Sequence, residues 1–289
     1  MARRSALDEA REAYAHDLAR RSRATDPRVE RMFELVPREA FLPPGPWLIS
    51  GEGRLVETPD ADPVHLYRNA LVVLDHEKGI NNGEPLLHAM WMVAAAPQPG
   101  ETVTHIGAGA GYYTAILSML VLPGGRVQAY EIDPALAAAA RQNLQPFDNV
   151  AVLERDAVEA DLEPSDLIYV NAGVVAPPAA WLRALQLGGR LIFPWRPSEQ
   201  VGLTVMVTRG KRGFAAQALG GAWFIACAGA SDRATAIRTP TSAEANSVRG
   251  VVLAENAAPD RTAVAVYPEL WFSSELPQKP VDPRRPRAH

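Results

Sequence analysis

Cysteine is almost absent from this chain. Cys227 is the only cysteine among 289 residues, which excludes an intrachain disulfide and a zinc site built on several cysteines. No grouping of His, Asp and Glu has a spacing typical of metal ligands either. The sequence therefore predicts no structural or catalytic metal.

Long apolar runs and an excess of one charge are missing as well. No apolar stretch reaches the ~20 residues that span a bilayer, and the N-terminal segment lacks the apolar core of a secretory signal. The 29 basic and 33 acidic residues give a formal net charge of −4. The basic residues are not massed in one stretch, so no nucleic-acid partner is expected. We expect a cytoplasmic protein, and nothing in the sequence indicates its oligomeric state.

The pattern of the first 85 residues predicts two helices, then an irregular segment that leads into a third helix. Ser5 and Asp8 form a capping-box pattern for a helix to about Arg21. Asp26 and Pro27 start a second helix. Residues 48–66 are polar and irregular, so we expect a loop there. The segment "HEKGINNGEP" then leads into a third helix, with Pro85 at its first position and Asn82 or Glu84 as its cap.

From Glu101 the pattern alternates between strands and helices, which favours a doubly wound parallel sheet. Segments 202–210 and 222–229 read as a closing strand pair, joined through a turn at 210–213. Beyond Gly229, segments 250–258 and 262–272 have the character of two further strands, and the proline-rich tail from 276 reads as disordered. We divide the chain into a substrate cover (1–85), a core domain (86–229) and a C-terminal extension (230–289).

The most informative stretch is "VTHIGAGAGYYTAIL", with Gly107, Gly109 and Gly111 at alternate positions between a strand and a helix. Glycines there let the backbone pass close to a ligand. Tyr112 stands where a dinucleotide fingerprint has its third glycine. No Lys-Ser/Thr pair follows, so the turn is not a phosphate-binding P-loop.

Two acids follow the next two strands. Glu131 ends "YEID" and is placed to accept hydrogen bonds from a ribose diol. Asp156 ends "ERDAVE" and is placed to accept from an adenine amine, with Ala157 offering a backbone N–H. The three elements in this order fit S-adenosylmethionine (SAM) best. We expect Ala108, Tyr112 and Ile132 to complete the cofactor site.

At this point the sequence resembles the protein-L-isoaspartate O-methyltransferase family, from about Val36 to Gly229. The resemblance rests on "VPREAFLP", "IGAGAGYYTAIL", "VQAYEIDPALAAAARQNL", "LERDAVE", "LQLGGRLIFPW" and "WFIACAG". It implies a Rossmann-like SAM methyltransferase fold with N-terminal helices, a seven-stranded, mostly parallel sheet with an antiparallel last strand, and a C-terminal extension. It also implies methyl transfer to a carboxylate.

Three positions depart from that family pattern. His105 stands where family members usually carry an acid that helps to hold the ammonium end of SAM; neutral imidazole accepts a hydrogen bond but adds no negative charge. The substrate loop reads "GINNGEP" in place of a Thr-Ile-Ser pattern. Residues 224–227 replace a Phe-Val-Pro-Leu run. The parts that face the substrate have thus changed more than the cofactor frame.

A carboxylate acceptor is ionised at pH 7, so it needs donors and no general base. Asn81 and Asn82, with the start of the following helix, are the predicted donors, and Asn171 at a strand end is predicted to orient the substrate. Asn171 and His105 are also expected to belong to the cofactor site. Glu84 is predicted to bind the SAM ammonium group in compensation for His105. A hydroxyl acceptor would need a base, for which His76, His88 and His105 are the nearby candidates.

The sequence thus predicts a SAM-dependent O-methyltransferase acting on a carboxylate of a peptide, protein or small metabolite. Methylation of a natural-product hydroxyl is the alternative within enzymes. A SAM-binding module without catalysis is the alternative of another class, and an NAD oxidoreductase is disfavoured by Tyr112.

Overall fold

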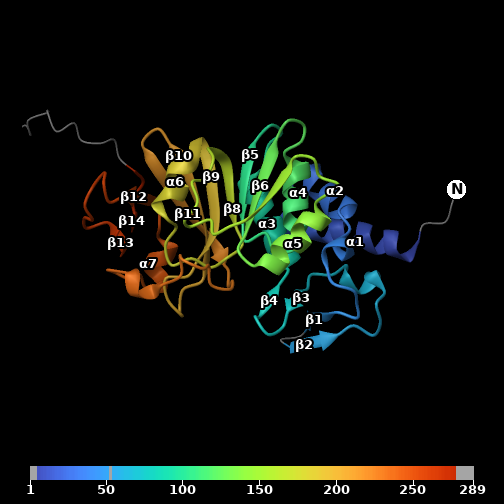
Figure 1. The fold of residues 1–289 in the computed structure, drawn as a ribbon. Coiled ribbons are helices and arrows are strands. Elements are labelled where there is room, and N and C mark those ends of the chain that lie inside the picture. Colours follow the sequence, from blue (N-terminus) through green and yellow to red (C-terminus); the bar gives the residue numbers. More distant parts are fainter. Residues whose placement is uncertain (1–4, 52–53, 278–289) are drawn as a thin grey trace, which may run out of the picture. The chain divides into compact units, whose positions relative to one another are not determined.

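The computed structural model describes residues 5–51 and 54–277 (Figure 1). The chain divides into two compact units. The N-terminal unit comprises Met1–Asp161 with Tyr169–Asn171, and the C-terminal unit comprises Leu162–Ile168 with Ala172–His289. The boundaries drawn from the sequence at residues 85 and 229 stay predictions. The tail predicted to be disordered lies, from residue 278 on, outside the described residues.

A parallel sheet forms the centre of the N-terminal unit, as predicted. Strands β5 (Thr102–Ile106), β6 (Arg126–Glu131) and β7 (Val150–Glu154) lie side by side in that order. All of β5 is buried, which its run of β-branched residues suits. The register pairs Ile106 with Tyr130, and Glu131 with Glu154. The carboxyl ends of the strands therefore meet at one edge, where ligands bind in such sheets.

Helices start at this same edge. Helix α4 (Tyr112–Leu120) follows β5 directly after Gly111, and α5 (Pro134–Asn143) follows β6. Asp133 caps α5, since its carboxylate accepts from the N–H groups of Ala135 and Leu136. Helix α3 (Pro85–Ala95) leads into β5 and has Pro85 at its first position, as predicted.

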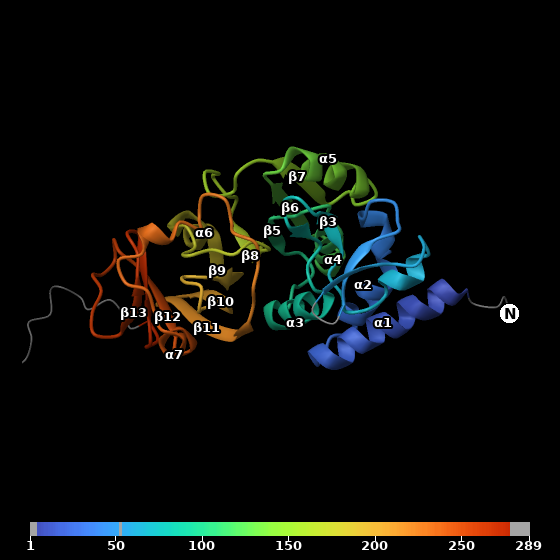
Figure 2. The same ribbon diagram turned by 90° about the horizontal axis from the view of Figure 1, so that it is seen from below.

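The N-terminal helices confirm the capping predictions. Helix α1 (Ala6–Ser22) begins with a capping box of Ser5 and Asp8, and α2 (Pro27–Leu35) begins at the predicted Asp26 cap. Helix α1 packs against α2 and α3, and α2 packs against α4 (Figure 2). This places the helical layer next to the glycine turn that opens α4.

The prediction of a loop over residues 48–66 was wrong. This region contains an antiparallel hairpin of β1 (Leu48–Gly51) and β2 (Arg54–Glu57). Alternate side chains explain it: Trp47 and Ile49 point inward and pack on Leu66 and Val72. The rest of the segment has two short 3-10 turns, η1 (Arg38–Phe41) and η2 (Pro63–Leu66), and the paired strands β3 (Val73–Asp75) and β4 (Ile80–Asn81).

The C-terminal unit is built on an antiparallel sheet in the order β13-β14-β12-β11-β10-β9. Its first strands are β9 (Leu185–Trp195), β10 (Leu203–Gly210) and β11 (Gly213–Gly221), after the short helix α6 (Ala179–Ala184). Strand β8 (Ser165–Val170) is divided between the two units. The mixed α/β class with antiparallel final strands is thereby confirmed.

The last predicted strand of the core was placed too late. Strand β11 occupies Gly213–Gly221, whereas 222–229 is irregular and forms only the isolated bridge between Gly173 and Ala226. The tight turn between Gly210 and Gly213 explains the difference, because β11 pairs with β10 from the first residue after that turn.

The C-terminal extension adds strands to this sheet. They are β12 (Gly250–Leu253), β13 (Ala263–Val266) and β14 (Leu270–Ser273), with the 3-10 turn η3 (Arg233–Thr235) and the helix α7 (Ser242–Asn246) before them. The segment at 262–272 was predicted as one strand, but the chain turns where Tyr267 N–H donates to the Leu270 carbonyl. Pro268 lies in that turn and cannot donate to a strand ladder.

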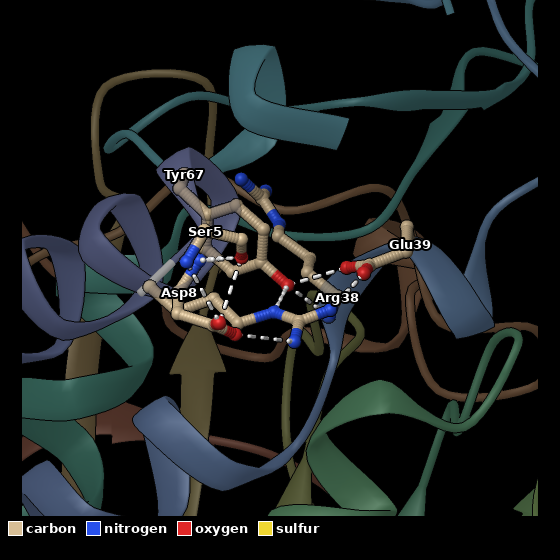
Figure 3. A network of polar contacts seen from close by, with 6 residues as sticks. Ser5, Asp8, Arg38, Glu39 and Tyr67 are labelled. Carbon is tan, nitrogen blue, oxygen red and sulfur yellow. Dashed lines mark hydrogen bonds and ion pairs between the residues drawn. The ribbon is translucent and has the colours of Figure 1, made fainter. Parts of the chain in front are cut away.

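A polar network ties α1 to the segment that follows α2 (Figure 3). Arg11 donates from Nε to the Tyr67 hydroxyl at 2.8 Å and pairs with the Glu39 carboxylate, which also accepts from the Tyr67 hydroxyl. Burial raises the pKa of Tyr67, so the hydroxyl keeps its proton and remains a donor. The Tyr67 oxygen accepts in turn from the backbone N–H of Arg38.

Arg38 is fully buried and its guanidinium binds backbone instead of an acid. Nη1 donates to the carbonyls of Leu66 and Arg68 at 2.7 and 3.2 Å, and Nη2 donates to the Ala70 carbonyl at 2.5 Å and to Asn82 Oδ1 at 3.2 Å. One side chain thereby holds both ends of the segment between η2 and β4.

Arg38→Met should lower the free energy of unfolding by at least about 3 kcal/mol, because several buried carbonyls lose a charged donor. Denaturant unfolding followed by tryptophan fluorescence measures this. Arg20→Met is the matched control, since Arg20 is exposed and paired only with Asp17, and we expect a change below about 0.5 kcal/mol. Equal effects of the two substitutions would contradict the anchoring role of Arg38.

Candidate cofactor site

The turn after β5 is shaped by its three glycines. Their φ angles are +75° at Gly107, +56° at Gly109 and +97° at Gly111, a region that other residues avoid. The N–H groups of Gly107 and Ala108 donate to the Tyr130 carbonyl at 2.9 and 3.1 Å, which fixes the turn on the end of β6.

Gly111 has a second reason beyond its φ angle. A Cβ on Gly111 would lie 2.7 Å from Leu144 Cδ1, so this glycine is required for packing. A Cβ on Gly107 would be in ordinary van der Waals contact with Asn171 at 3.5 Å or more, and one on Gly109 would meet Leu74 Cδ1 at 3.9 Å. Gly107 and Gly109 are thus required by their φ angles and not by packing, and as glycines they leave the backbone of the turn without side chains.

Glu131 lies against this turn. It is 7% exposed, and its carboxylate accepts from the N–H of Gly109 at 2.7 Å and from the N–H of Asp133 at 2.9 Å. Burial raises the pKa of Glu131, while these backbone donors oppose that shift. Each carboxylate oxygen keeps a further lone pair, so the group can still accept from a ligand hydroxyl.

The residues predicted around the adenine follow the neighbouring strands. Ile132 comes directly after Glu131 and is 51% exposed, an unusual position for a large apolar side chain. Asp156 comes after β7 and accepts from the Val158 N–H at 2.8 Å, while Ala157 is buried. The backbone N–H of Arg155 donates to the Glu131 carbonyl at 3.1 Å, so the segment with Asp156 lies next to Glu131.

His105 is fully buried in β5, and both of its ring nitrogens are occupied. Nδ1 lies 2.8 Å from Thr114 Oγ1, and Nε2 lies 2.8 Å from Asn171 Nδ2. Burial lowers the pKa of His105 to about 3, so the ring is neutral. This revises the expectation that His105 contacts the cofactor directly, since any effect on a ligand must pass through its two partners.

Asn171 follows β8 and stands beside the glycine turn. Its N–H donates to the Ile106 carbonyl at 2.8 Å, and its Cβ lies 3.6 Å from where a Cβ on Gly107 would be. With Nδ2 on His105, the amide oxygen Oδ1 is buried and has no hydrogen-bond partner. An acceptor left in this state is a candidate contact for a ligand donor.

The two asparagines of the substrate segment differ in surroundings. Asn81 Oδ1 accepts from the Gly83 N–H at 3.0 Å, a local turn. Asn82 Oδ1 accepts from the Val72 N–H at 2.9 Å and from Arg38, so Asn82 is part of the buried frame, although its Nδ2 has no partner. Donation from either residue to a substrate stays a prediction.

Glu84 occupies the N-cap position of α3 and accepts from Asn69 Nδ2 at 2.6 Å. Asn69 Oδ1 accepts from the Leu86 N–H at 2.8 Å and so serves the helix start that the sequence suggested was free for an anion. Sequence reasoning missed Asn69 because it lies 17 positions before Leu86, outside any local capping pattern.

Two further predicted residues have packed side chains. The Tyr112 ring is 3% exposed and meets Phe41 edge to face, which leaves its backbone to face the turn. His88 is fully buried, stacks on Tyr113 at 3.6 Å between ring centroids and bonds through Nδ1 to the Tyr169 hydroxyl at 2.9 Å. Burial lowers the pKa of His88, which makes it a weak base.

Over the described residues no set of three or more His, Cys, Asp or Glu side chains is grouped to hold a metal ion. Within the same part of the chain, no helix combines the length and the apolar character needed to cross a bilayer.

Comparison with known proteins identifies relatives of this arrangement. A family model described as protein-L-isoaspartate(D-aspartate) O-methyltransferase matches residues 60–231. The protein-L-isoaspartate O-methyltransferase of Aeropyrum pernix is 32% identical over 64% of this chain and 66% of its own length. The enzyme of the same name from Methanothermobacter thermautotrophicus is 28% identical over 65% of this chain and 80% of its own. The chain thus spans just under two thirds of the first relative's length.

Two solved structures share the fold. A protein-L-isoaspartate O-methyltransferase superposes with a TM-score of 0.66 at 19% identity, covering 92% of this chain and 88% of its own. A putative protein-L-isoaspartate O-methyltransferase from Plasmodium falciparum, solved with S-adenosyl-L-homocysteine, gives 0.59 at 19% identity over 75% of this chain and 97% of its own. The predicted Rossmann-like methyltransferase fold is confirmed.

The buried, neutral state of His105 should appear in the pH dependence of stability. The folded chain keeps the ring unprotonated down to about pH 3, whereas the unfolded chain binds the proton near pH 6.5. Stability is therefore full above about pH 6.5 and is lost as the pH falls toward 3, on the order of 2 kcal/mol between pH 7 and pH 5.

In unfolding measurements at pH 5 and 7, His105→Gln should lose less stability than the parent chain over this range. His88 contributes a shift of the same sign, so part of the pH dependence should remain. An unchanged pH dependence in His105→Gln would show that His105 does not supply it.

Proposed function

We propose, since the chain belongs to the protein-L-isoaspartate O-methyltransferase family, that it transfers the methyl group of SAM to a carboxylate of a peptide or protein. The family match supports a SAM-dependent methyltransferase by class and favours SAM over NAD as the cofactor. The choice of acceptor is the proposal. The cytoplasmic location expected from the sequence is part of it.

The single observation that carries the proposal is the contact between Glu131 and the glycine turn. A buried carboxylate with spare lone pairs lies within 2.7 Å of the Gly109 nitrogen, beside a stretch of backbone that no Cβ obstructs. A ribose diol needs such an acceptor, and its sugar needs such an approach. Glu131 and the turn at Gly107 and Gly109 therefore fit the nucleoside part of SAM.

The exposed Ile132 and the Asp156 segment suit the adenine. An apolar side chain that is half exposed beside Glu131 offers one face to a planar base. Asp156 keeps a carboxylate oxygen beyond its bond to Val158. Bound SAM would supply an electrophilic methyl group on a sulfonium, and the protein would have to hold the acceptor oxygen in line with it.

Two of the three histidines named as candidate bases are poorly suited to that role, which favours a carboxylate over a hydroxyl acceptor. His105 is neutral with both nitrogens occupied, and His88 is packed between aromatic rings with a lowered pKa. A hydroxyl must lose a proton during transfer, and these side chains are poorly suited to take it. A carboxylate is already ionised and needs only orientation.

The test is methyl transfer from radiolabelled SAM to an isoaspartyl peptide, with the matching aspartyl peptide as control. Label on the isoaspartyl peptide that mild base releases as methanol indicates a methyl ester and supports the proposal. Base-stable label on a hydroxyl acceptor would replace it with the alternative of hydroxyl methylation. Tight SAM binding without turnover on any acceptor would favour a binding module.

Glu131→Gln should weaken binding of S-adenosylhomocysteine by roughly tenfold or more, because a hydrogen bond to a charged group contributes about 1.5–3 kcal/mol. Isothermal titration calorimetry measures this. Glu154→Gln is the control, because Glu154 is the register partner of Glu131 but is exposed and paired with Arg141. The affinity of this variant for S-adenosylhomocysteine should stay within about twofold of the parent value. Similar affinities for both variants would remove Glu131 from the cofactor site.

A further inference from the structure

We propose that His105 is a positioning residue that locks the Asn171 amide, so that Asn171 Oδ1 accepts a hydrogen bond from the ammonium group of SAM. The proposal rests on the proposed function, because it assigns the amino-acid end of the cofactor. In place of the acid expected before the first glycine, it assigns a neutral pair: His105 in β5 and Asn171, which directly follows β8.

The lock is a chain of three side chains from three elements. Thr114 on α4 contacts His105 Nδ1, and His105 Nε2 receives Asn171 Nδ2, each at 2.8 Å. Thr114 and His105 are fully buried, so water does not compete for these bonds. Since Nε2 receives an N–H, the ring proton must be on Nδ1, where Thr114 Oγ1 accepts it.

The backbone fixes the same residue from its other side. The Asn171 N–H is held by the Ile106 carbonyl, one residue from His105 and one from Gly107. With its main chain and its amide nitrogen both bound, Asn171 has little freedom to turn its amide group. The Asn171 amide is therefore held next to the glycine turn, since the Asn171 Cβ lies 3.6 Å from where a Cβ on Gly107 would be.

The chemistry of Oδ1 selects the kind of group it binds. It is a buried acceptor without a partner in the described structure, a state that costs free energy unless a donor arrives. An ammonium or hydroxyl donor satisfies it, whereas a carboxylate is repelled by it. Of the groups in SAM outside the nucleoside, only the ammonium group donates, which identifies the end of the cofactor that meets Asn171.

The decisive experiment compares two ligands by calorimetry: S-adenosylhomocysteine and 5′-methylthioadenosine, which has the nucleoside and the sulfur but no amino acid. Asn171→Ala should lower the affinity for S-adenosylhomocysteine by roughly tenfold to a hundredfold, and the affinity for 5′-methylthioadenosine should stay within about twofold of the parent value. Equal weakening of both ligands, or of neither, would overturn the proposal. Asn149→Ala is the matched control, because the Asn149 amide binds only the Ser118 and Gly125 carbonyls.

Two positioning variants test the lock without touching Oδ1. His105→Leu and Thr114→Val should each show the same selective loss, smaller for Thr114→Val because it removes only the distant bond. If His105→Leu fails to fold, Thr114→Val alone decides the point. Loss of affinity for both ligands alike would indicate a merely structural role and would contradict the proposal.

Nitrogen-15 NMR of the histidines in the unliganded protein gives a readout free of ligand. The proposal requires a His105 ring protonated at Nδ1 and bare at Nε2 from pH 5 to pH 8. A proton on Nε2 would reverse the Asn171 amide and overturn the proposal. If the parent chain binds neither ligand, the proposed function itself fails, which is distinct from binding both ligands without selectivity at Asn171.

Discussion

The hydrogen bond from the Gly109 N–H to the Glu131 carboxylate is the interaction on which the candidate site depends. It joins the turn after β5 to the end of β6, two elements that the parallel register brings to the same edge. Burying a carboxylate is costly unless donors surround it. Here the backbone of the turn and of Asp133 supplies those donors. The turn thus keeps its shape and Glu131 keeps its place through one shared contact.

A second constraint holds the segment between η2 and α3. Arg38 gives its hydrogen bonds to carbonyls of this segment and to Asn82, and Asn69 links Glu84 to the first turn of α3. These bonds order a stretch that has little regular structure. Asn81, in contrast, makes only a local bond to the Gly83 N–H, and its role toward a substrate stays a prediction.

Local patterns could be predicted from the sequence, whereas pairs distant in the chain could not. The Ser5 capping box, the Pro85 helix start and the place of Glu131 at the end of a strand follow from short spacings or from the alternation of strands and helices. The partner of His105 lies 66 positions away at Asn171, and no period links the two. The hairpin at β1 and β2 was missed because its inward residues find their cover at Leu66 and Val72, outside the strands themselves.

The neutral pair at His105 and Asn171 bears on how the ammonium group of SAM is held. An acid at position 105 would attract that group through a full negative charge, whereas an amide oxygen offers a hydrogen bond without the charge. The pair can compensate only if the oxygen is held in place, because a fixed acceptor does not have to be ordered when the ligand binds. The bonds of Asn171 Nδ2 to His105 and of the Asn171 N–H to the Ile106 carbonyl meet that condition. The exchange at position 105 therefore concerns the cofactor and does not by itself select the acceptor.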